Sequence, residues 1–411
     1  MHFDQKLSFF RIKYVNSQYS RKKMLLENIC PICTSTKISE FLSRKNIPIQ
    51  QNFLLSDRTS AINVPRGNLD LVICEDCGFT FNQSFDPSKL TYTTNYDNSQ
   101  DFSLFFENYL SKLANYLINE KKIQHSNIVE VGCGKGSFLR KLVERDELNN
   151  VGYGFDPSYV GPHTALDGRL KFQTSYYDSK CSTIPADVVI CRHVIEHVPR
   201  PLNLLQTIKQ ALINSQHAHV FFETPDVEWI LYNQVIWDFF YEHCSYFSPQ
   251  SIVTLFETAG FRVENVRRVF EGQYIWLEAT IPKQKPDITK NQGKIPTLAK
   301  QFAASESSLI KQWLYKIKKL NSFGKVALWG AGAKGVTFAN LIDPECKWID
   351  CVIDLNPQKH GKYVSGTGHL IINYKEVAQR KVKNAILMNP NYYNEILELL
   401  KKDKLNINLL V

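Results

Sequence analysis

The stretch Ile128-Val129-Glu130-Val131-Gly132-Cys133-Gly134-Lys135-Gly136-Ser137-Phe138-Leu139 decides the fold of this chain. An apolar run typical of a β-strand ends at an acid, glycines follow at alternate positions, and helix-forming residues come next. Glycine lets the backbone approach a ligand closely and adopt a positive φ. The pattern predicts a nucleotide-like ligand over the end of a parallel strand, and an ordinary glycine-rich turn is the alternative.

Length and composition limit what the rest of the chain can be. The 411 residues predict two or three domains, and 44% hydrophobic with 22% charged residues is typical of a globular protein. No apolar run is long enough to cross a bilayer, and the residues after Met1 lack the apolar core of a signal peptide. We therefore expect a cytoplasmic location and no membrane insertion. The net charge of +9 is scattered, which suits an anionic partner, either a phosphorylated small molecule or nucleic acid.

Four of the ten cysteines form two CxxC pairs near the N-terminus: Cys30 with Cys33, and Cys74 with Cys77. Each pair can form a tight turn whose thiolates face one point, and two such turns give the tetrahedral Cys₄ set that structural zinc prefers. Gly78 stands where the second turn needs a positive φ. A redox CxxC motif or unpaired cysteines are the alternatives. The pattern predicts a zinc-binding domain over residues 26–90.

Two further strands extend the pattern that the glycine loop begins. The run 151–155 ends at Asp156, about where an acid contacts ribose hydroxyls, and Asp178 is a candidate for the adenine edge. The run 186–191 leads into Arg192 and His193, which we expect to line the same pocket. His193, Glu196 and His197 have helical i, i+3, i+4 spacing, which suits either a capped helix start or a metal.

An aromatic segment over residues 237–248 follows a further predicted strand, 219–223. It contains Glu242 and His243 between aromatic side chains. A histidine beside a glutamate in such surroundings is a candidate general base, because burial and the carboxylate set its pKa. A buried, hydrogen-bonded structural histidine is the alternative.

The last third of the chain contains a second glycine loop. Residues 260–263 and 274–279 predict an antiparallel pair that closes the first sheet; residues 282–300 read as a linker and 309–320 as a helix. The strand 326–329 then leads into G-x-G-x-x-G at 330–335, and a later strand ends at Asp354. This pattern fits a dinucleotide or a phosphate on a helix N-terminus, and Lys334 favours an anion.

The loop from Glu130 to Gly136 has the E-x-G-x-G-x-G form of class I S-adenosylmethionine (SAM) methyltransferases, and the chain resembles that superfamily here. From about Cys30 to its end it resembles the bacterial sugar C-methyltransferases that act on nucleotide-linked 4-ketosugars. The resemblance implies a SAM pocket that includes the three loop glycines, and His243 as the base that forms an enolate. It also implies that Glu242 orients that base and that Tyr96 matches a family tyrosine. The predicted cofactor-binding residues are Glu130, Gly132, Gly134, Gly136, Asp156, Asp178, Arg192 and His193.

The combined expectation is an α/β protein with three parts. A class I SAM methyltransferase core with a Rossmann-like fold, 96–283, follows the zinc-binding domain, and a second Rossmann-like domain, 301–411, lies on the substrate side with Gly332 and Lys334 as ligand contacts. The expected partner is a nucleotide sugar rather than nucleic acid. An RNA methyltransferase with a zinc-binding recognition domain, an NAD(P)-binding enzyme or regulator, and a non-catalytic scaffold are the alternatives.

Overall fold

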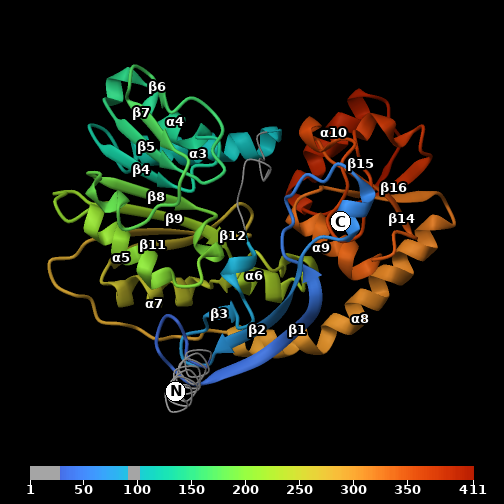
Figure 1. The fold of residues 1–411 in the computed structure, drawn as a ribbon, viewed down its shortest axis with the longest axis horizontal. Helices are drawn as coiled ribbons and strands as arrows, with labels where there is room; N and C mark the ends of the chain where they lie inside the picture. Colours follow the sequence, from blue (N-terminus) through green and yellow to red (C-terminus); the bar gives the residue numbers. More distant parts are fainter. Residues whose placement is uncertain (1–27, 91–101) are drawn as a thin grey trace, which may run out of the picture.

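The computed structural model describes residues 28–90 and 102–411. Its two large lobes each contain a sheet whose central strands are parallel, and an N-terminal hairpin lies below both of them (Figure 1). In the described residues, no helix has the length and apolar character needed to cross a membrane.

The methyltransferase lobe is built on an eight-stranded sheet of order β11-β12-β9-β8-β4-β5-β7-β6. Strands β9, β8, β4, β5 and β7 are parallel, whereas β11, β12 and β6 join by antiparallel pairing. The bounds are β4 Asn127–Val131, β5 Val151–Phe155, β6 Thr164–Ala165, β7 Leu170–Gln173, β8 Val188–Arg192, β9 His219–Pro225, β11 Arg262–Val269 and β12 Tyr274–Thr280. This confirms the predicted strand order along the chain and the antiparallel closing pair.

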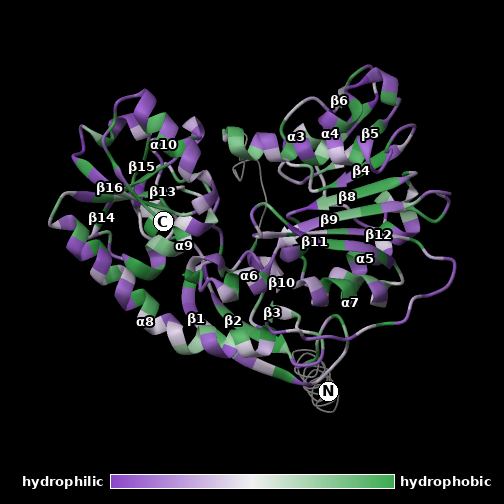
Figure 2. Cartoon of the chain, turned by 180° about the vertical axis from the view of Figure 1, so that it is seen from behind, coloured by the Kyte–Doolittle hydropathy of each residue, from purple (hydrophilic) through white to green (hydrophobic). Residues whose placement is uncertain are grey.

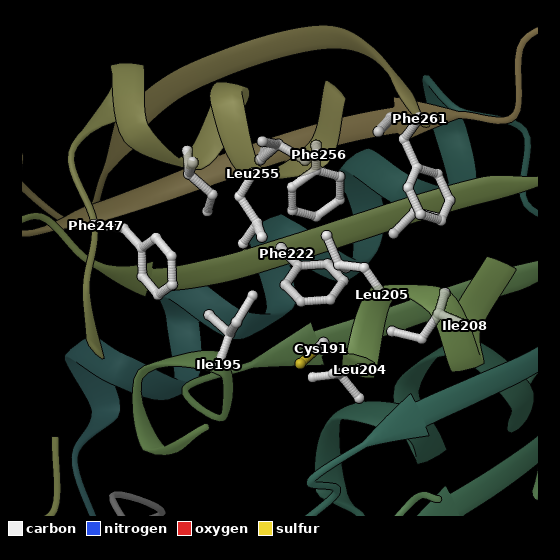
Figure 3. Close-up of a cluster of buried hydrophobic side chains, with 14 of the residues drawn as sticks. Cys191, Ile195, Leu204, Leu205, Ile208, Phe222, Phe247, Leu255, Phe256 and Phe261 are labelled. Carbon is white, nitrogen blue, oxygen red and sulfur yellow. The ribbon is translucent and has the colours of Figure 1, made fainter. Parts of the chain in front are cut away.

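Helices cover both faces of this sheet. Helices α3 (Leu104–Asn119) and α4 (Ser137–Val143) pack on one face, and α5 (Pro201–Ala211) and α7 (Pro249–Ala259) on the other. Figure 3 shows the second interface, where Leu205 and Phe256 meet Phe222 of the central sheet. The N-cap of α3 is Ser103, whose side chain accepts the N–H of Phe106.

The C-terminal lobe has a parallel five-stranded sheet of order β15-β14-β13-β16-β17. Its strands are β13 Lys325–Trp329, β14 Ile349–Ile353, β15 Ile371–Ile372, β16 Val382–Leu387 and β17 Asn408–Leu410, with helices α9 Ala333–Ile342 and α10 Tyr393–Lys402. In both lobes the glycine loop follows a central strand with parallel neighbours on either side, β4 or β13. This is the switch point at which ligands bind in open α/β sheets.

Helix α8 (Ile295–Asn321) is longer than the sequence pattern predicted, because part of the predicted linker is helical. Pro296 suits the first turn of a helix, and Ile295, Ala299 and Phe302 are buried. Its residues alternate between hydrophilic and hydrophobic along its length (Figure 2). Tertiary packing of this apolar face accounts for helix formation where composition alone suggested a linker.

The N-terminal part forms a four-stranded antiparallel sheet, β1 Ile38–Pro48, β2 Arg66–Cys74, β3 Thr80–Asn82 and β10 Ser245–Tyr246. The last strand belongs to the methyltransferase lobe in sequence. Figure 2 shows β10 beside β3, and the paired residues are Ser245 with Phe81 and Tyr246 with Thr80. The cysteine-containing part and the predicted catalytic segment therefore share one sheet.

Candidate active site between the two lobes

A cavity of about 460 Å³ lies between the carboxyl ends of the two parallel sheets. The loop after β4 and the loop after β13 both line it, as do Phe240 and His243. The predicted residues that line it are Glu130, Gly132, Gly134, Asp156, Arg192, His193, His243, Gly332 and Lys334. The structure thus brings most of the predicted site together.

The loop after β4 has the backbone geometry that its glycines predict. Gly132, Gly134 and Gly136 have φ of 71°, 53° and 77°. A Cβ on Gly132 would lie 2.0 Å from Cγ2 of Val194, whereas one on Gly134 would meet no protein atom within 4 Å. The backbone at Gly134 is therefore open to a closely bound ligand, which is the fit that SAM requires.

Two acids support this loop in different ways. The Glu130 carboxylate is buried and accepts the N–H of Leu139 at 3.2 Å, and burial raises its pKa to about 8. Asp156 accepts the N–H of Gly134 at 2.9 Å. Asp156 is the acid at the rim of the cavity, and Glu130 supports the loop and the start of α4 from inside.

Arg192 and His193 belong to a buried network centred on Glu223. Arg192 Nη2 lies 3.2 Å and His193 Nε2 lies 2.7 Å from the same Glu223 oxygen, and the Tyr109 hydroxyl donates to the other at 2.6 Å. Burial opposes ionisation of Glu223, but the two cations outweigh it and lower its pKa to about 2. Burial likewise opposes protonation of His193, but Glu196 and Glu223 raise its pKa to about 9. His193 is therefore charged near neutral pH.

Asp178 lies away from the cavity, contrary to its predicted adenine contact. Its side chain is exposed and accepts the N–H of Lys180 at 2.9 Å, in the turn before a short 3-10 helix, Cys181–Thr183. The capped helix start predicted near His193 is also absent from this described segment: residues Ile195–His197 form a 3-10 turn with no side-chain cap. Tyr96 lies outside the described residues.

His243 faces the cavity within a ring of aromatic and imidazole groups. Its ring centroid lies 4.2 Å from that of Phe240 and 4.7 Å from that of His197. Burial is the main reason that its pKa lies well below the usual range, and the charges of His197, His193 and Lys334 act in the same direction. The side chain is thus neutral near pH 7 and able to accept a proton.

A hydrogen bond to the Glu242 carboxylate leads away from His243, towards the N-terminal part of the chain. The chain turns at Tyr241 and Glu242, and the carboxylate accepts the backbone N–H of Gln51 at 2.6 Å. A neighbour that the sequence did not single out for His243 is His197, whose Nδ1 lies 3.0 Å from the Glu242 carbonyl oxygen. In the sequence, His197 is grouped with His193 and Glu196 by helical spacing. In the structure, its ring packs against that of His243.

Ligand atoms gather within 4.8 Å of one another in two groups of the described residues. In the first, Cys30, Cys33, Cys74 and Cys77 are buried, and Sγ distances are 3.7 Å for Cys30–Cys77 and 3.5 Å for Cys33–Cys74. Four close thiols match a tetrahedral zinc set. The second group is Glu196, His197 and His243. In it Glu196 accepts the Thr224 hydroxyl at 3.0 Å, and His197 Nδ1 lies 3.0 Å from the Glu242 carbonyl oxygen.

The loop after β13 carries positive charge at the opposite wall of the cavity. Lys334 Nζ lies 2.8 Å from Asp238 and 3.1 Å from the side-chain oxygen of Gln273. Asp354 accepts the N–H of Ala331 at 2.7 Å and lies 3.6 Å from Lys359 Nζ. Asp354 stands where an acid binds the ribose in a dinucleotide site, but here it contacts the loop and Lys359. Lys334 and Lys359 make this side of the cavity suitable for an anion.

Comparisons with known proteins give a separate family match for each of the two lobes. A methyltransferase domain family matches residues 103–266, and a C-methyltransferase C-terminal domain family matches residues 291–405. C-methyltransferase NovU of Streptomyces niveus is 24% identical over 390 residues, covering 90% of this chain and 91% of that protein. A ubiquinone biosynthesis O-methyltransferase of Vibrio cholerae is 30% identical over 122 residues, 28% of this chain and 46% of that enzyme. The chain thus spans about half the length of the ubiquinone enzymes.

Among solved structures, a Burkholderia thailandensis 1,6-didemethyltoxoflavin-N1-methyltransferase aligns with a TM-score of 0.33 and 13% identity, covering 43% of this chain and 80% of that one. The two family matches divide at the boundary between the lobes, with one glycine loop in each. The chain therefore contains a methyltransferase domain followed by a C-methyltransferase C-terminal domain.

Proposed function

We propose that the protein methylates a carbon of a nucleotide-linked ketosugar, or of a related glycan precursor, with His243 as the base. The observation that carries this proposal is the position of His243 in a cavity that both glycine loops line. A donor at the first loop and an anionic acceptor at the second would meet at this histidine. The similarity to C-methyltransferase NovU over most of both chains supports carbon as the methylated atom.

The chemistry follows from the charges around the cavity. Neutral His243 takes a proton from the carbon beside the ketone, the C–H bond breaks, and its electron pair moves towards the ketone oxygen to give an enolate. Charged His193 and Lys334, which hold the pKa of His243 low, also favour this negative charge. When bound, SAM would supply the electrophilic methyl group: the nucleophilic carbon would form a C–C bond to it as the S–CH₃ bond breaks and S-adenosylhomocysteine leaves. Gly132, Gly134 and Asp156 are the residues that would hold SAM.

The test is the His243→Ala variant with thymidine- and uridine-diphosphate 4-ketosugars as acceptors. Loss of a general base should lower turnover by about 10²- to 10⁴-fold, while affinity for S-adenosylhomocysteine stays unchanged in calorimetry. Exchange of the acceptor proton with deuterium oxide should fall in parallel. Full turnover by the variant would remove His243 from this role.

The pH profile gives an independent check of the same role. The neutral imidazole is the active form, and its pKa lies well below the ordinary 6.5. The kcat/KM of the wild-type enzyme should therefore lose no activity from this group around neutrality, and should decline only when the pH falls well below 6.5. A decline centred above pH 6.5 that His243→Ala abolishes would contradict this prediction.

We also propose that the four cysteines hold a structural zinc ion. The support is the burial and close approach of all four thiols, which leaves no coordination position for a substrate. Metal analysis should give about one zinc per chain, by the four-ligand rule. Protein purified without chelator that contains no zinc would overturn this assignment, and Cys30→Ser should lose the metal.

A further inference from the structure

The segment that carries His243 is held from behind by the N-terminal part of the chain. Residues 236–246 comprise a 3-10 turn, Ile236–Asp238, a connecting stretch with His243, and β10. Strand β10 pairs with β3, and the N–H of Asn82 donates to the Cys244 carbonyl at 2.9 Å. Strand β3 in turn pairs with β2, which ends at Cys74 of the cysteine cluster.

Side-chain contacts extend this attachment on either side of His243. The backbone N–H of Gln51 donates to Glu242, and that of Asp86 donates to the Tyr241 hydroxyl at 2.9 Å. No hydrogen bond reaches the His243 ring from the described residues, so its placement depends on the backbone that flanks it and on ring contacts with Phe240, His197 and Tyr246. The flanking residues are held by the N-terminal sheet and also by the segment after β8, since His197 Nδ1 lies 3.0 Å from the Glu242 carbonyl oxygen and the Ser245 hydroxyl donates to the Val198 carbonyl at 2.9 Å.

Arg44 of β1 is the central contact. Its Nη1 donates to the Phe239 carbonyl at 2.8 Å and its Nη2 to the Ile236 carbonyl at 2.6 Å. The same guanidinium pairs with Glu306 of α8, with Nη2–Oε1 at 2.6 Å and Nε–Oε1 at 2.8 Å. Arg44 is 7% exposed, so these contacts are made out of water. A single planar fork therefore joins the N-terminal sheet, the His243 segment and the C-terminal lobe.

We propose that the four-cysteine domain positions His243 for catalysis, with Arg44 as its principal positioning residue. The inference rests on the proposed role of His243 and extends it to a part of the chain that lies outside the cavity. Removing the guanidinium leaves the carbonyl groups of Ile236 and Phe239 and the carboxylate of Glu306 without this donor, beside the turn that precedes His243. A displacement of about 1 Å in a catalytic group is enough to cost about 10²-fold in rate.

The experiment compares Arg44→Lys with Arg66→Lys in the full-length protein. Arg66, on β2 of the same sheet, also donates to backbone carbonyls, those of Asn46 and Gly366 at 3.0 Å, but does not contact the 236–246 segment. The readouts are calorimetric affinity for S-adenosylhomocysteine, and the imidazole resonances of His243 in histidine-labelled protein, assigned with His243→Gln. The resonances are followed through a pH titration.

Arg44→Lys should leave S-adenosylhomocysteine affinity within about twofold, because the loop after β4 is not attached to Arg44. It should nevertheless move the His243 resonance and raise its titration midpoint as burial is relaxed. Turnover should fall by about tenfold or more. Arg66→Lys should change none of these. A folded Arg44→Lys protein with unchanged His243 resonances would overturn the inference.

Two controls keep the result decisive. If Arg44→Lys does not fold, Glu306→Gln replaces it, since this change keeps the size of the partner and removes only its charge; unchanged His243 resonances there would likewise overturn the inference. The resonance readout needs no acceptor. Wild-type protein that turns over no diphosphate ketosugar would therefore refute the proposed function while leaving the positioning result to stand or fall separately.

Discussion

The loop after β4 and the loop after β13 share one construction. In each, the first glycine donates to the last residue of the next strand, Gly132 to Phe155 at 2.8 Å and Gly330 to Ile353 at 2.7 Å. In each, an aspartate just beyond that strand accepts a loop N–H, Asp156 from Gly134 and Asp354 from Ala331. The same local sequence pattern therefore produces the same hydrogen-bonded loop conformation after the central strand of both lobes.

The two loops differ in the charges placed around them. Glu130 supports the first loop from below and Asp156 stands at its rim, whereas Lys334 and Lys359 flank the second. Acids near an open backbone suit ribose hydroxyls and a cationic group, and lysines suit phosphate. A glycine loop thus identifies a place for a ligand, and the side chains around it identify the kind of ligand.

The largest effect is expected from an added methyl group in the first loop. Gly132→Ala places a Cβ at a positive φ and against Val194, and strain of about 1–3 kcal/mol with this overlap should weaken S-adenosylhomocysteine binding by about 100-fold. In the second loop, a Cβ from Gly332→Ala meets only Asn52 Oδ1, at 3.9 Å, and should leave that affinity within about twofold. Calorimetry measures both, and equal losses would show that the loops are not specialised.

A smaller effect is expected from removing the cation of the second loop. A charge-assisted hydrogen bond contributes about 1.5–3 kcal/mol, so Lys334→Met should weaken binding of uridine or thymidine diphosphate by about tenfold or more, without affecting S-adenosylhomocysteine. Asp238→Asn is the matched control, because it disrupts the same ion pair but keeps the cation. If Asp238→Asn binds diphosphate more weakly than Lys334→Met does, the Lys334–Asp238 ion pair has only a structural role.

The smallest effect concerns the acid that only the first loop has. Because burial raises the pKa of Glu130 from 4.5 to about 8, the folded state retains a proton that the unfolded chain releases. The stability from this group is complete below pH 4.5 and is lost as the pH rises to about 8. This loss of stability should lower the Tm of the wild-type protein between about pH 5 and 8. Glu130→Gln keeps an acceptor for Leu139 and cannot ionise, so its Tm should fall by a few degrees less over the same range. An unchanged slope in thermal unfolding would refute the burial argument.

Features encoded in neighbouring residues were predictable from the sequence. The three glycines of the first loop, the strand that ends at Asp156 and the two CxxC turns each depend on short-range patterns, and the structure places them as expected. Parallel strand pairing then brings both glycine loops to carboxyl ends of sheets, as general rules of α/β folds require.

Features that depend on contacts between distant residues were not predictable. The pairing of β10 with β3 joins residues far apart in sequence, and two residues of β10 carry too little pattern to reveal it. Glu242 is adjacent to His243 in sequence, but the turn between them directs its carboxylate to Gln51. Asp178 has the residue type of a ligand contact but not the position, since its own turn uses the carboxylate.

The pairing of β10 with β3 also defines what can be exchanged between related proteins. A chimera that replaced residues 28–90 alone would leave β3 with a foreign edge partner and would separate Arg44 from the carbonyls that it binds. The smallest transferable unit is therefore discontinuous, and includes residues 236–246 together with Glu306 of α8. During synthesis, the same edge of β3 stays unpaired until β10 leaves the ribosome, so all four cysteines are synthesised before the sheet can be completed.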